Sequence, residues 1–208
     1  DMEDFIKPYV ETLSTKMSEV IGQSSVTMDR KRPHSLLGNL TSDALRVMGE
    51  KYTGEKIDLG IMNMGGLRKD LDKGDITLGS IFRIYPFENT LKLLKIKGKY
   101  VEQVIKATAG KGLEAFSGTE ITLQTTNDKT EAIKILLGGK PIDEEKIYNV
   151  MTIDYLAEGN NGMTGLTYAD ETVDIGILLR DAMLEYIQDT TSKGKQVDAK
   201  LDNRVIVL

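Results

Sequence analysis

The sequence has 208 residues, a net charge of −5, no cysteine and a single histidine, His34. This length suits one domain with a sizeable core, and 40% hydrophobic with 28% charged residues is ordinary for a folded globular protein. The acidic balance argues against nucleic-acid binding through phosphates, and the lack of cysteine with one histidine excludes thiolate zinc sites, disulfides and multi-histidine metal centres.

Two helices are predicted in the first fifty residues. Apolar residues recur every three or four positions over 4–21, which is typical of an amphipathic helix, and Gly22 would end it. The weakly alternating residues 23–29 are either an edge strand or a plain connector. A second apolar stripe predicts a helix from Leu36 to about Gly49.

The rest of the chain alternates strand and helix patterns. Strands are predicted at 57–62, 91–96, 119–125, 132–137, 147–153 and 205–208. Helices are predicted at 100–108 and 175–187, while 111–118 reads as a loop. We therefore expect an α+β (mixed α/β) fold, a single compact domain of layered sheet and helices whose strand order stays open. No apolar run is long enough for a membrane span, and no signal peptide is expected.

Two loops carry side chains suited to a ligand. The strand at 57–62 breaks into Asn63-Met64-Gly65-Gly66, where glycines allow close approach and Arg68 supplies a planar cation. Further on, Pro86 fixes the backbone before Phe87 and Asn89, so that a ring and a carboxamide lie close together. Taken singly, each piece is as well explained by a turn, a surface charge or a core edge.

In their order, the motifs N-x-G-G-x-R, G-D-I-T and P-F-x-N-T closely resemble the C-terminal domain of the 5'-nucleotidases, the family of bacterial UDP-sugar hydrolases and animal ecto-5'-nucleotidases. Two more segments share the likeness: S-x-L-G-N-L-x-x-D-A at 35–44, and the aromatic, Leu-Ala and glycine pattern at 155–162. The resemblance covers nearly the whole chain from about Arg30. We expect residues 1–29 to be a helical extension packed on the domain and 30–208 to be the 5'-nucleotidase-like domain.

The resemblance implies that the base of a nucleotide or nucleoside stacks between Phe87 and Tyr155. It also implies that Asn63 hydrogen-bonds the base and that Asn89 lies beside the ring of Phe87. Base stacking of this kind contributes about 1–3 kcal/mol per base and tolerates different bases.

By the same resemblance, Arg68 and Asn161 would contact ribose, and Lys31 or a basic neighbour would assist. Three positions depart from the family: Met64 and Glu88 replace glycines, and Asn161 replaces an aspartate. Glu88 adds a negative charge beside the expected ligand, which leads to the hypothesis that nucleosides are preferred over nucleotides. His34 replaces a glutamate usual in the motif, and we expect it to be a packing or surface residue.

In the family, this domain binds substrate while an N-terminal metallophosphatase domain with two metal ions cleaves the phosphate ester. The resemblance therefore implies a substrate-binding domain with no catalytic centre, no cofactor and no metal of its own. Its expected partners are a nucleotide or nucleoside and a metallophosphatase domain or chain, not nucleic acid. The resemblance also implies that the protein is located in the periplasm or on the cell surface, where a lipid anchor could attach it.

Three other functions remain open from the sequence. The chain could be a stand-alone nucleoside-binding or scavenging protein without a phosphatase partner. It could be an independent hydrolase that uses Asp154 and Glu158, although loop carboxylates are usually solvated. It could also be a degenerate domain retained for protein contacts.

Overall fold

The computed structural model describes residues 2–208, with side chains described from residue 10 onward. Its α-helices are α1 (Met2–Met17), α2 (Leu36–Thr53), α3 (Leu78–Ile84), α4 (Gly98–Ala109), α5 (Asp154–Ala157) and α6 (Leu179–Ser192). Short 3-10 helices are η1 (Met64–Gly66), η2 (Asn160–Gly162) and η3 (Thr164–Tyr168). The strands are β1 (Val20–Ser24), β2 (Leu59–Met62), β3 (Gly74–Thr77), β4 (Thr90–Lys97), β5 (Ala115–Ser117), β6 (Thr119–Thr126), β7 (Lys129–Leu137), β8 (Lys140–Pro141), β9 (Ile147–Ile153), β10 (Glu171–Leu178) and β11 (Val205–Val207).

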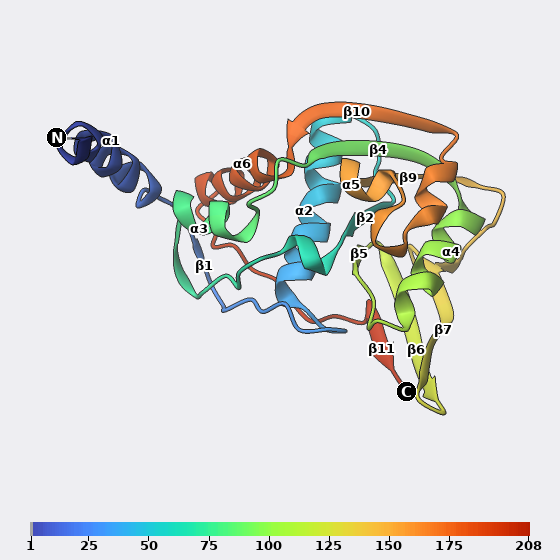
Figure 1. The fold of residues 1–208 in the computed structure, drawn as a ribbon. Helices are drawn as coiled ribbons and strands as arrows, with labels where there is room; N and C mark the ends of the chain where they lie inside the picture. Colours follow the sequence, from blue (N-terminus) through green and yellow to red (C-terminus); the bar gives the residue numbers. More distant parts are fainter. Residues whose placement is uncertain (1) are drawn as a thin grey trace.

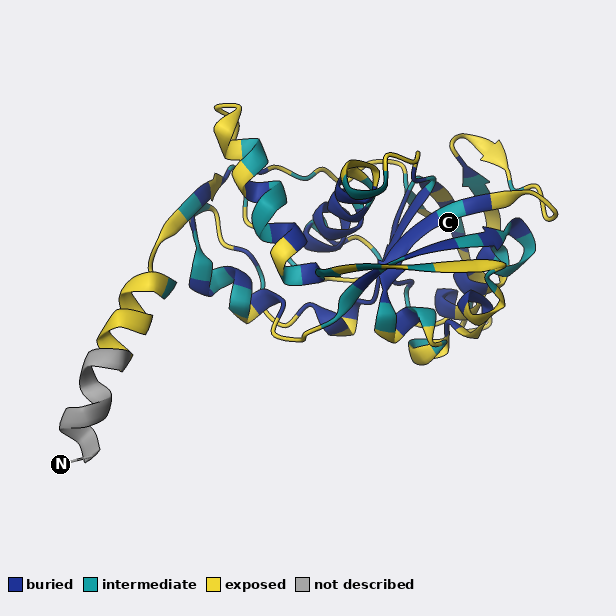
Figure 2. Ribbon diagram, turned by 90° about the horizontal axis from the view of Figure 1, so that it is seen from above, coloured by how far each residue is buried: buried dark blue, intermediate teal, exposed yellow. Residues whose placement is uncertain are grey.

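A five-stranded sheet with the order β10-β4-β9-β2-β5 forms the centre of the molecule (Figure 1). β2 runs parallel to β9, whereas β4 is antiparallel to β9 and pairs Leu91 with Ile153. The carboxyl ends of β2 and β9 and the amino end of β4 therefore meet at one edge of the sheet. β2, β5 and β9 are largely buried, as the dark central ribbons of Figure 2 show, whereas the residues of the edge strand β10 are exposed or half-buried.

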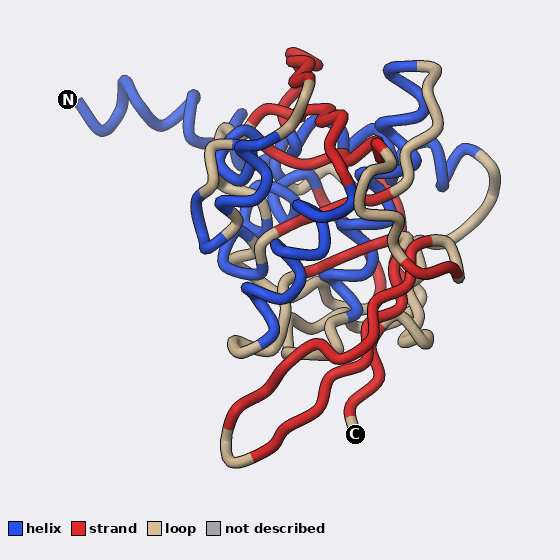
Figure 3. The backbone as a smooth tube through the Cα atoms, turned by 90° about the vertical axis from the view of Figure 1, so that its right-hand side faces the viewer, coloured by secondary structure: helices blue, strands red, loops and turns tan. Residues whose placement is uncertain are grey.

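A second sheet has the order β11-β6-β7-β8 and is built on the long β6–β7 hairpin, which projects from the body (Figure 3). The hairpin turns at Asn127 and Asp128, whose φ angles of 51° and 61° both lie in the left-handed region. Short polar residues tolerate this conformation, and its twist suits a tight hairpin. The sequence predicted this turn correctly.

Helix α2 packs closely against the central sheet. It begins after Ser35, whose hydroxyl accepts a hydrogen bond from the backbone N–H of Gly38, and it ends at Gly54 with φ 69°. A Cβ atom on Gly60 of β2 would lie 2.1 Å from the carbonyl oxygen of Ser42 in α2. Only glycine at this position allows the helix to approach the strand so closely.

The predicted mixed α/β single domain is confirmed, but several boundaries differ. The first helix ends at Met17, and Val20–Ser24 forms β1, because this segment pairs with β3. α2 continues past Gly49 to Thr53. α3 and β5 were not predicted, and the first four residues of the helix predicted at 175–187 belong to β10, which pairs with β4.

Helix α1 lies outside the body of the domain in Figure 1, and its carboxyl end reaches α3. At that contact, a Cβ atom on Gly79 would lie 2.9 Å from the carbonyl oxygen of Met17. β1 follows and pairs with β3, so the chain joins the domain before residue 30. The domain boundary between residues 29 and 30 stays a prediction.

Candidate functional site

The loop after β2 lies at the edge where three strand ends meet. Asn63 is buried at 6% exposure, and its side-chain oxygen has no hydrogen-bond partner among the described residues. Its backbone carbonyl accepts a hydrogen bond from the N–H of Gly66, which closes the turn η1. Asn63 is thus part of the loop's interior, and a direct hydrogen bond to a base stays a prediction.

Arg68 and Phe87 lie against each other at the surface. The guanidinium carbon of Arg68 is 5.9 Å from the centre of the Phe87 ring, which is a cation–π distance. The backbone N–H of Arg68 donates to the carbonyl of Ile84, so the loop after β2 is fixed to the end of α3. Phe87 remains 49% exposed. A half-exposed aromatic ring therefore lies next to an arginine whose backbone is fixed.

The carboxylate of Asp154 joins the two loops that carry the predicted stacking rings. Its Oδ1 accepts from the side-chain amide of Asn89 at 2.8 Å and from the backbone N–H of Tyr155 at 2.7 Å. Its Oδ2 accepts from the hydroxyl of Thr90 at 3.2 Å. Tyr155 is 42% exposed. The structure thus brings Asn89, two residues after Phe87, to the backbone of Tyr155.

Asp154 is held in its charged form by these contacts. Burial opposes ionisation, but hydrogen bonds from the Asn89 side chain, the backbone of Thr90 and Tyr155 and the Thr90 hydroxyl outweigh it, so the pKa of Asp154 lies below its ordinary value of 3.8. A carboxylate occupied in this way is a structural anchor rather than a free base. Glu158, the other carboxylate considered for hydrolysis, is exposed in the adjoining turn.

Glu114 is a buried anchor that the sequence did not reveal. Its side chain is 2% exposed and accepts two hydrogen bonds from Arg32, at 2.8 and 2.9 Å. It also accepts from the side-chain amide of Asn161 at 2.7 Å and from the backbone N–H of Met64. Glu114 therefore connects the loop after β2 to Asn161. The one feature of the sequence that could have indicated this anchor is an acidic residue with apolar neighbours, in Leu113-Glu114-Ala115-Phe116.

The three basic residues before α2 have different roles. Arg32 is committed to Glu114, and Arg30 contacts Asp70 at 2.6 Å. Lys31 has a side chain that is 85% exposed and lies 4.0 Å from a carboxylate oxygen of Asp29. It lines a cavity of about 410 Å³ formed by 29–32, 64–65 and 70. With one long ion pair and an exposed side chain, Lys31 is the member of the trio that can most easily turn to an anionic ligand. His34, three residues later, is exposed.

Neither a metal centre nor a membrane helix is found in the part of the chain that the structure describes. No three His, Cys, Asp or Glu side chains of these residues are grouped so that they could hold a metal ion. None of the described helices has the length and apolar character needed to cross a membrane.

The chain is similar in sequence to known proteins. The chain is 26% identical to the trifunctional nucleotide phosphoesterase protein YfkN of Bacillus subtilis over 90% of this chain and 14% of the relative. It is 24% identical to an apyrase of Tabanus yao over 87% of this chain and 37% of that protein. It thus spans well under half of these relatives.

Solved structures share the fold over almost the full chain. A 5'-nucleotidase precursor from Thermus thermophilus superposes with a TM-score of 0.84 at 25% identity, covering 99% of this chain and 43% of that one. The NAD nucleotidase NadN of Haemophilus influenzae has the same fold at a TM-score of 0.75 and 20% identity, covering 99% of this chain and 40% of that one. The family model described as "5'-nucleotidase, C-terminal domain" matches residues 20–168. The chain belongs to the family of 5'-nucleotidase C-terminal domains.

Proposed function

We propose that this chain binds the nucleoside part of the substrate of a 5'-nucleotidase-type phosphohydrolase, with the base held between Phe87 and Tyr155. The observation that carries the proposal is the carboxylate of Asp154, which receives hydrogen bonds from both ring-bearing loops through Asn89 and the backbone of Tyr155. Both rings stay more than two-fifths exposed. Exposed rings on anchored loops suit base stacking because little ordering of the loops is left to the moment of ligand binding.

The polar residues of the site divide between anchoring and recognition in this proposal. Arg68, fixed beside Phe87, would donate hydrogen bonds to ribose hydroxyls. Asn161 uses its amide N–H on Glu114, which leaves its side-chain oxygen to accept from ribose. Lys31 would attract the phosphate, and Asn89 would hold the Phe87 loop in place.

The chemistry of phosphate ester cleavage would belong to a metallophosphatase domain or chain that carries two metal ions. This part of the proposal is supported by the family to which the chain belongs, and by the fact that the chain matches only 14% and 37% of the length of two relatives. On this view the chain itself needs no cofactor. A periplasmic or cell-surface location is proposed on the family resemblance alone.

Titration calorimetry with adenosine, AMP, uridine and a UDP-sugar tests the proposal. We expect saturable binding of at least one ligand, weakened about 5- to 150-fold by Phe87→Ala or Tyr155→Ala, which corresponds to the loss of one stacked face. Tyr168→Ala is the matched control, because Tyr168 is 51% exposed and stacks on Tyr100, not on Phe87 or Tyr155.

Two outcomes would overturn the proposal. One is binding that survives both ring substitutions at full strength, because the rings would then not form the base site. The other is an absence of binding to all four ligands, both by the chain alone and by the chain joined to a metallophosphatase domain.

A further inference from the structure

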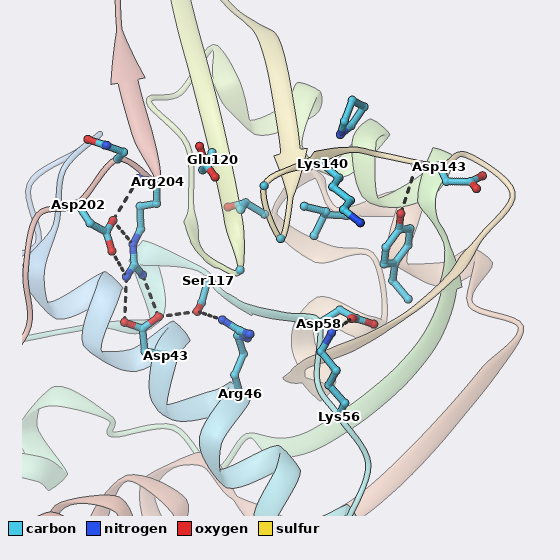
Figure 4. A pocket seen from close by; sticks show the side chains of 18 of the residues that line it. Asp43, Arg46, Lys56, Asp58, Ser117, Glu120, Lys140, Asp143, Asp202 and Arg204 are labelled. Carbon is cyan, nitrogen blue, oxygen red and sulfur yellow. Dashed lines mark hydrogen bonds and ion pairs between the residues drawn. The ribbon is translucent and has the colours of Figure 1, made fainter.

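A second, larger cavity lies at the opposite end of the central sheet. It has a volume of about 920 Å³ and is lined by residues before β2, at the start of β9 and at the end of β5 (Figure 4). Asp58 marks this end of β2, whereas Asn63 follows the other end. The cavity is therefore separate from the candidate nucleoside site. Its further walls come from α2, the base of the β6–β7 hairpin and residues 202–204.

Several charges in this cavity are already paired. Arg204 contacts Asp43 at 2.9 Å and Asp202 at 2.7 Å. Burial lowers the pKa of Arg204, but these two carboxylates outweigh the burial and raise the pKa above its ordinary value. Lys56 lies 3.4 Å from Asp58. The charges of these pairs largely compensate one another and leave little charge free for a ligand.

Three other cations of the lining, Arg46, Lys140 and Lys146, have no carboxylate partner among the described residues. Arg46 donates only to neutral oxygens, the Ile57 carbonyl at 3.2 Å and the Ser117 hydroxyl at 3.4 Å. Arg46 rises from α2 and Lys140 comes from β8 toward the same space (Figure 4).

Two acidic side chains of the lining, Glu120 and Asp143, also lack a cationic partner among the described residues. Asp143 accepts hydrogen bonds from the backbone N–H groups of Glu145 and Lys146 and points away from the centre of the cavity in Figure 4. Glu120 stands at the opposite wall from Arg46 in the same view. Among the charged side chains of the lining that have no ion-pair partner in the described part of the chain, three cations therefore stand against two carboxylates.

A buried hydroxyl provides a second, independent indication of a ligand. Thr119 lines the cavity and is 4% exposed, and its Oγ1 has no hydrogen-bond partner among the described residues. Buried hydroxyls in folded proteins are nearly always hydrogen-bonded, so an unpartnered one at a cavity wall suggests a missing partner. The neighbouring turn consists of Gly138 and Gly139, which have no side chains to obstruct a ligand.

We propose that this cavity binds a small organic oxyanion, a phosphorylated or carboxylated molecule that also carries hydroxyl groups. The planar guanidinium of Arg46 can donate two parallel hydrogen bonds to a phosphate or carboxylate, and Lys140 and Lys146 add positive charge. A turn of the Thr119 side chain, whose hydroxyl is buried, would let that hydroxyl bond a ligand hydroxyl. The volume lies within the range of small-molecule sites, and the polar walls favour a polar ligand over an apolar one.

NMR titration of the ¹⁵N-labelled chain with inorganic pyrophosphate, and separately with citrate, tests the proposal. We expect saturable shifts of the amide signals of Gly118, Gly138 and Gly139 with at least one probe. A response to pyrophosphate alone identifies a phosphorylated ligand, and a response to citrate alone identifies a carboxylated one. Shifts confined to Gly65 and Gly66 would place the anion at the nucleoside site and overturn the proposal, as would no saturable shift with either probe.

Substitutions then locate the binding groups. Lys140→Gln combined with Lys146→Gln is expected to weaken binding about tenfold or more, because charge-assisted hydrogen bonds to the ligand are lost. Both lysines are exposed, and the ammonium of Lys146 lies 4.9 Å from the centre of the Tyr148 ring. Arg46→Gln is expected to weaken it further. Lys73→Gln, an exposed lysine outside the cavity, is the control. Equal weakening by the control and the double variant would show general charge attraction and overturn the proposal.

Discussion

Removing Glu114 should loosen the candidate site and the fold together. In Glu114→Ala, Arg32 loses its partner, the backbone N–H of Met64 loses its acceptor and Asn161 loses its anchor. Removing one member of a buried ion pair costs about 3–5 kcal/mol. Arg32 keeps 31% of its side chain exposed, so water compensates part of the loss, and we expect the lower end, about 3 kcal/mol.

Urea unfolding followed by circular dichroism measures this loss. With a slope of about 2 kcal/mol per molar urea, a loss of about 3 kcal/mol lowers the midpoint by about 1.5 M. Nucleoside binding should weaken at the same time, because the loop after β2 and Asn161 are no longer held together. Glu158→Ala is the control: Glu158 is exposed, and its removal should change stability by less than about 0.5 kcal/mol.

A midpoint for Glu114→Ala within about 0.3 M of the control would refute this reasoning. Such a result would mean that Arg32 and the Met64 N–H are satisfied equally well by water, and hence that the carboxylate is not a structural anchor.

Three further predictions concern other parts of the chain. The pKa of Asp154 is lower in the folded protein than in the unfolded chain, so its carboxylate stabilises the fold above the unfolded pKa, and this stabilisation is lost as pH falls below about 4. In Asp154→Asn, stability measured by urea unfolding should therefore depend less on pH on the acid side. Gly60→Ala should destabilise the fold by about 1–3 kcal/mol or more in thermal unfolding, because its Cβ would meet the Ser42 carbonyl. Gly110→Ala is the control, because Gly110 has a right-handed backbone (φ −63°) and a Cβ there would lie 3.8 Å from its nearest neighbour, the Thr130 carbonyl oxygen. Glu88→Gln should raise the affinity for AMP relative to adenosine in calorimetry, and wild-type binding of AMP much more tightly than adenosine would contradict this.

Helix and strand types could be predicted wherever a segment has a strong period of its own. The helix around Leu45 was found, but its end was placed at Gly49 because glycine commonly terminates helices. In the structure Gly49 is a packing residue: a Cβ atom there would lie 2.7 Å from the Met151 side chain. The helix ends at Gly54, whose left-handed backbone conformation is the one that glycine commonly adopts at a helix end. A glycine's role depends on contacts that a local pattern does not contain.

The missed strands have the same cause. Ile175–Leu178 fits a helical stripe locally, but it belongs to β10, which pairs with β4 some eighty residues earlier in the chain. The pairing is irregular across this segment and resumes at Leu178, opposite Thr90. β5 is three residues long and is defined by pairing with β2. Tertiary pairing outweighs local preference in such short segments.

The site shows a similar division between what local patterns reveal and what they do not. The candidate contact residues stand in recognisable loops at strand ends, so their positions could be predicted. The groups that anchor those loops could not, because Asp154 binds Asn89 across 65 residues and Glu114 binds Arg32 across 82. The local sequence around an acidic loop residue does not show whether its carboxylate is hydrogen-bonded within the protein or solvated.

Anchoring and recognition are carried by different side chains at this edge of the sheet, and this gives them different experimental signatures. The carboxylate oxygens of Asp154 and Glu114 accept hydrogen bonds from other groups of the protein. Exposed side-chain surface, which a ligand could contact, remains on Phe87, Tyr155 and Lys31. Substituting an anchor should therefore reduce stability and affinity together. Substituting a ring should reduce affinity and cost less stability than Glu114→Ala, because Phe87 and Tyr155 are 49% and 42% exposed whereas the Glu114 side chain is 2% exposed. A ring variant that lost stability as strongly as Glu114→Ala would show that the ring supports the fold, and it would remove the main argument for a base-stacking role.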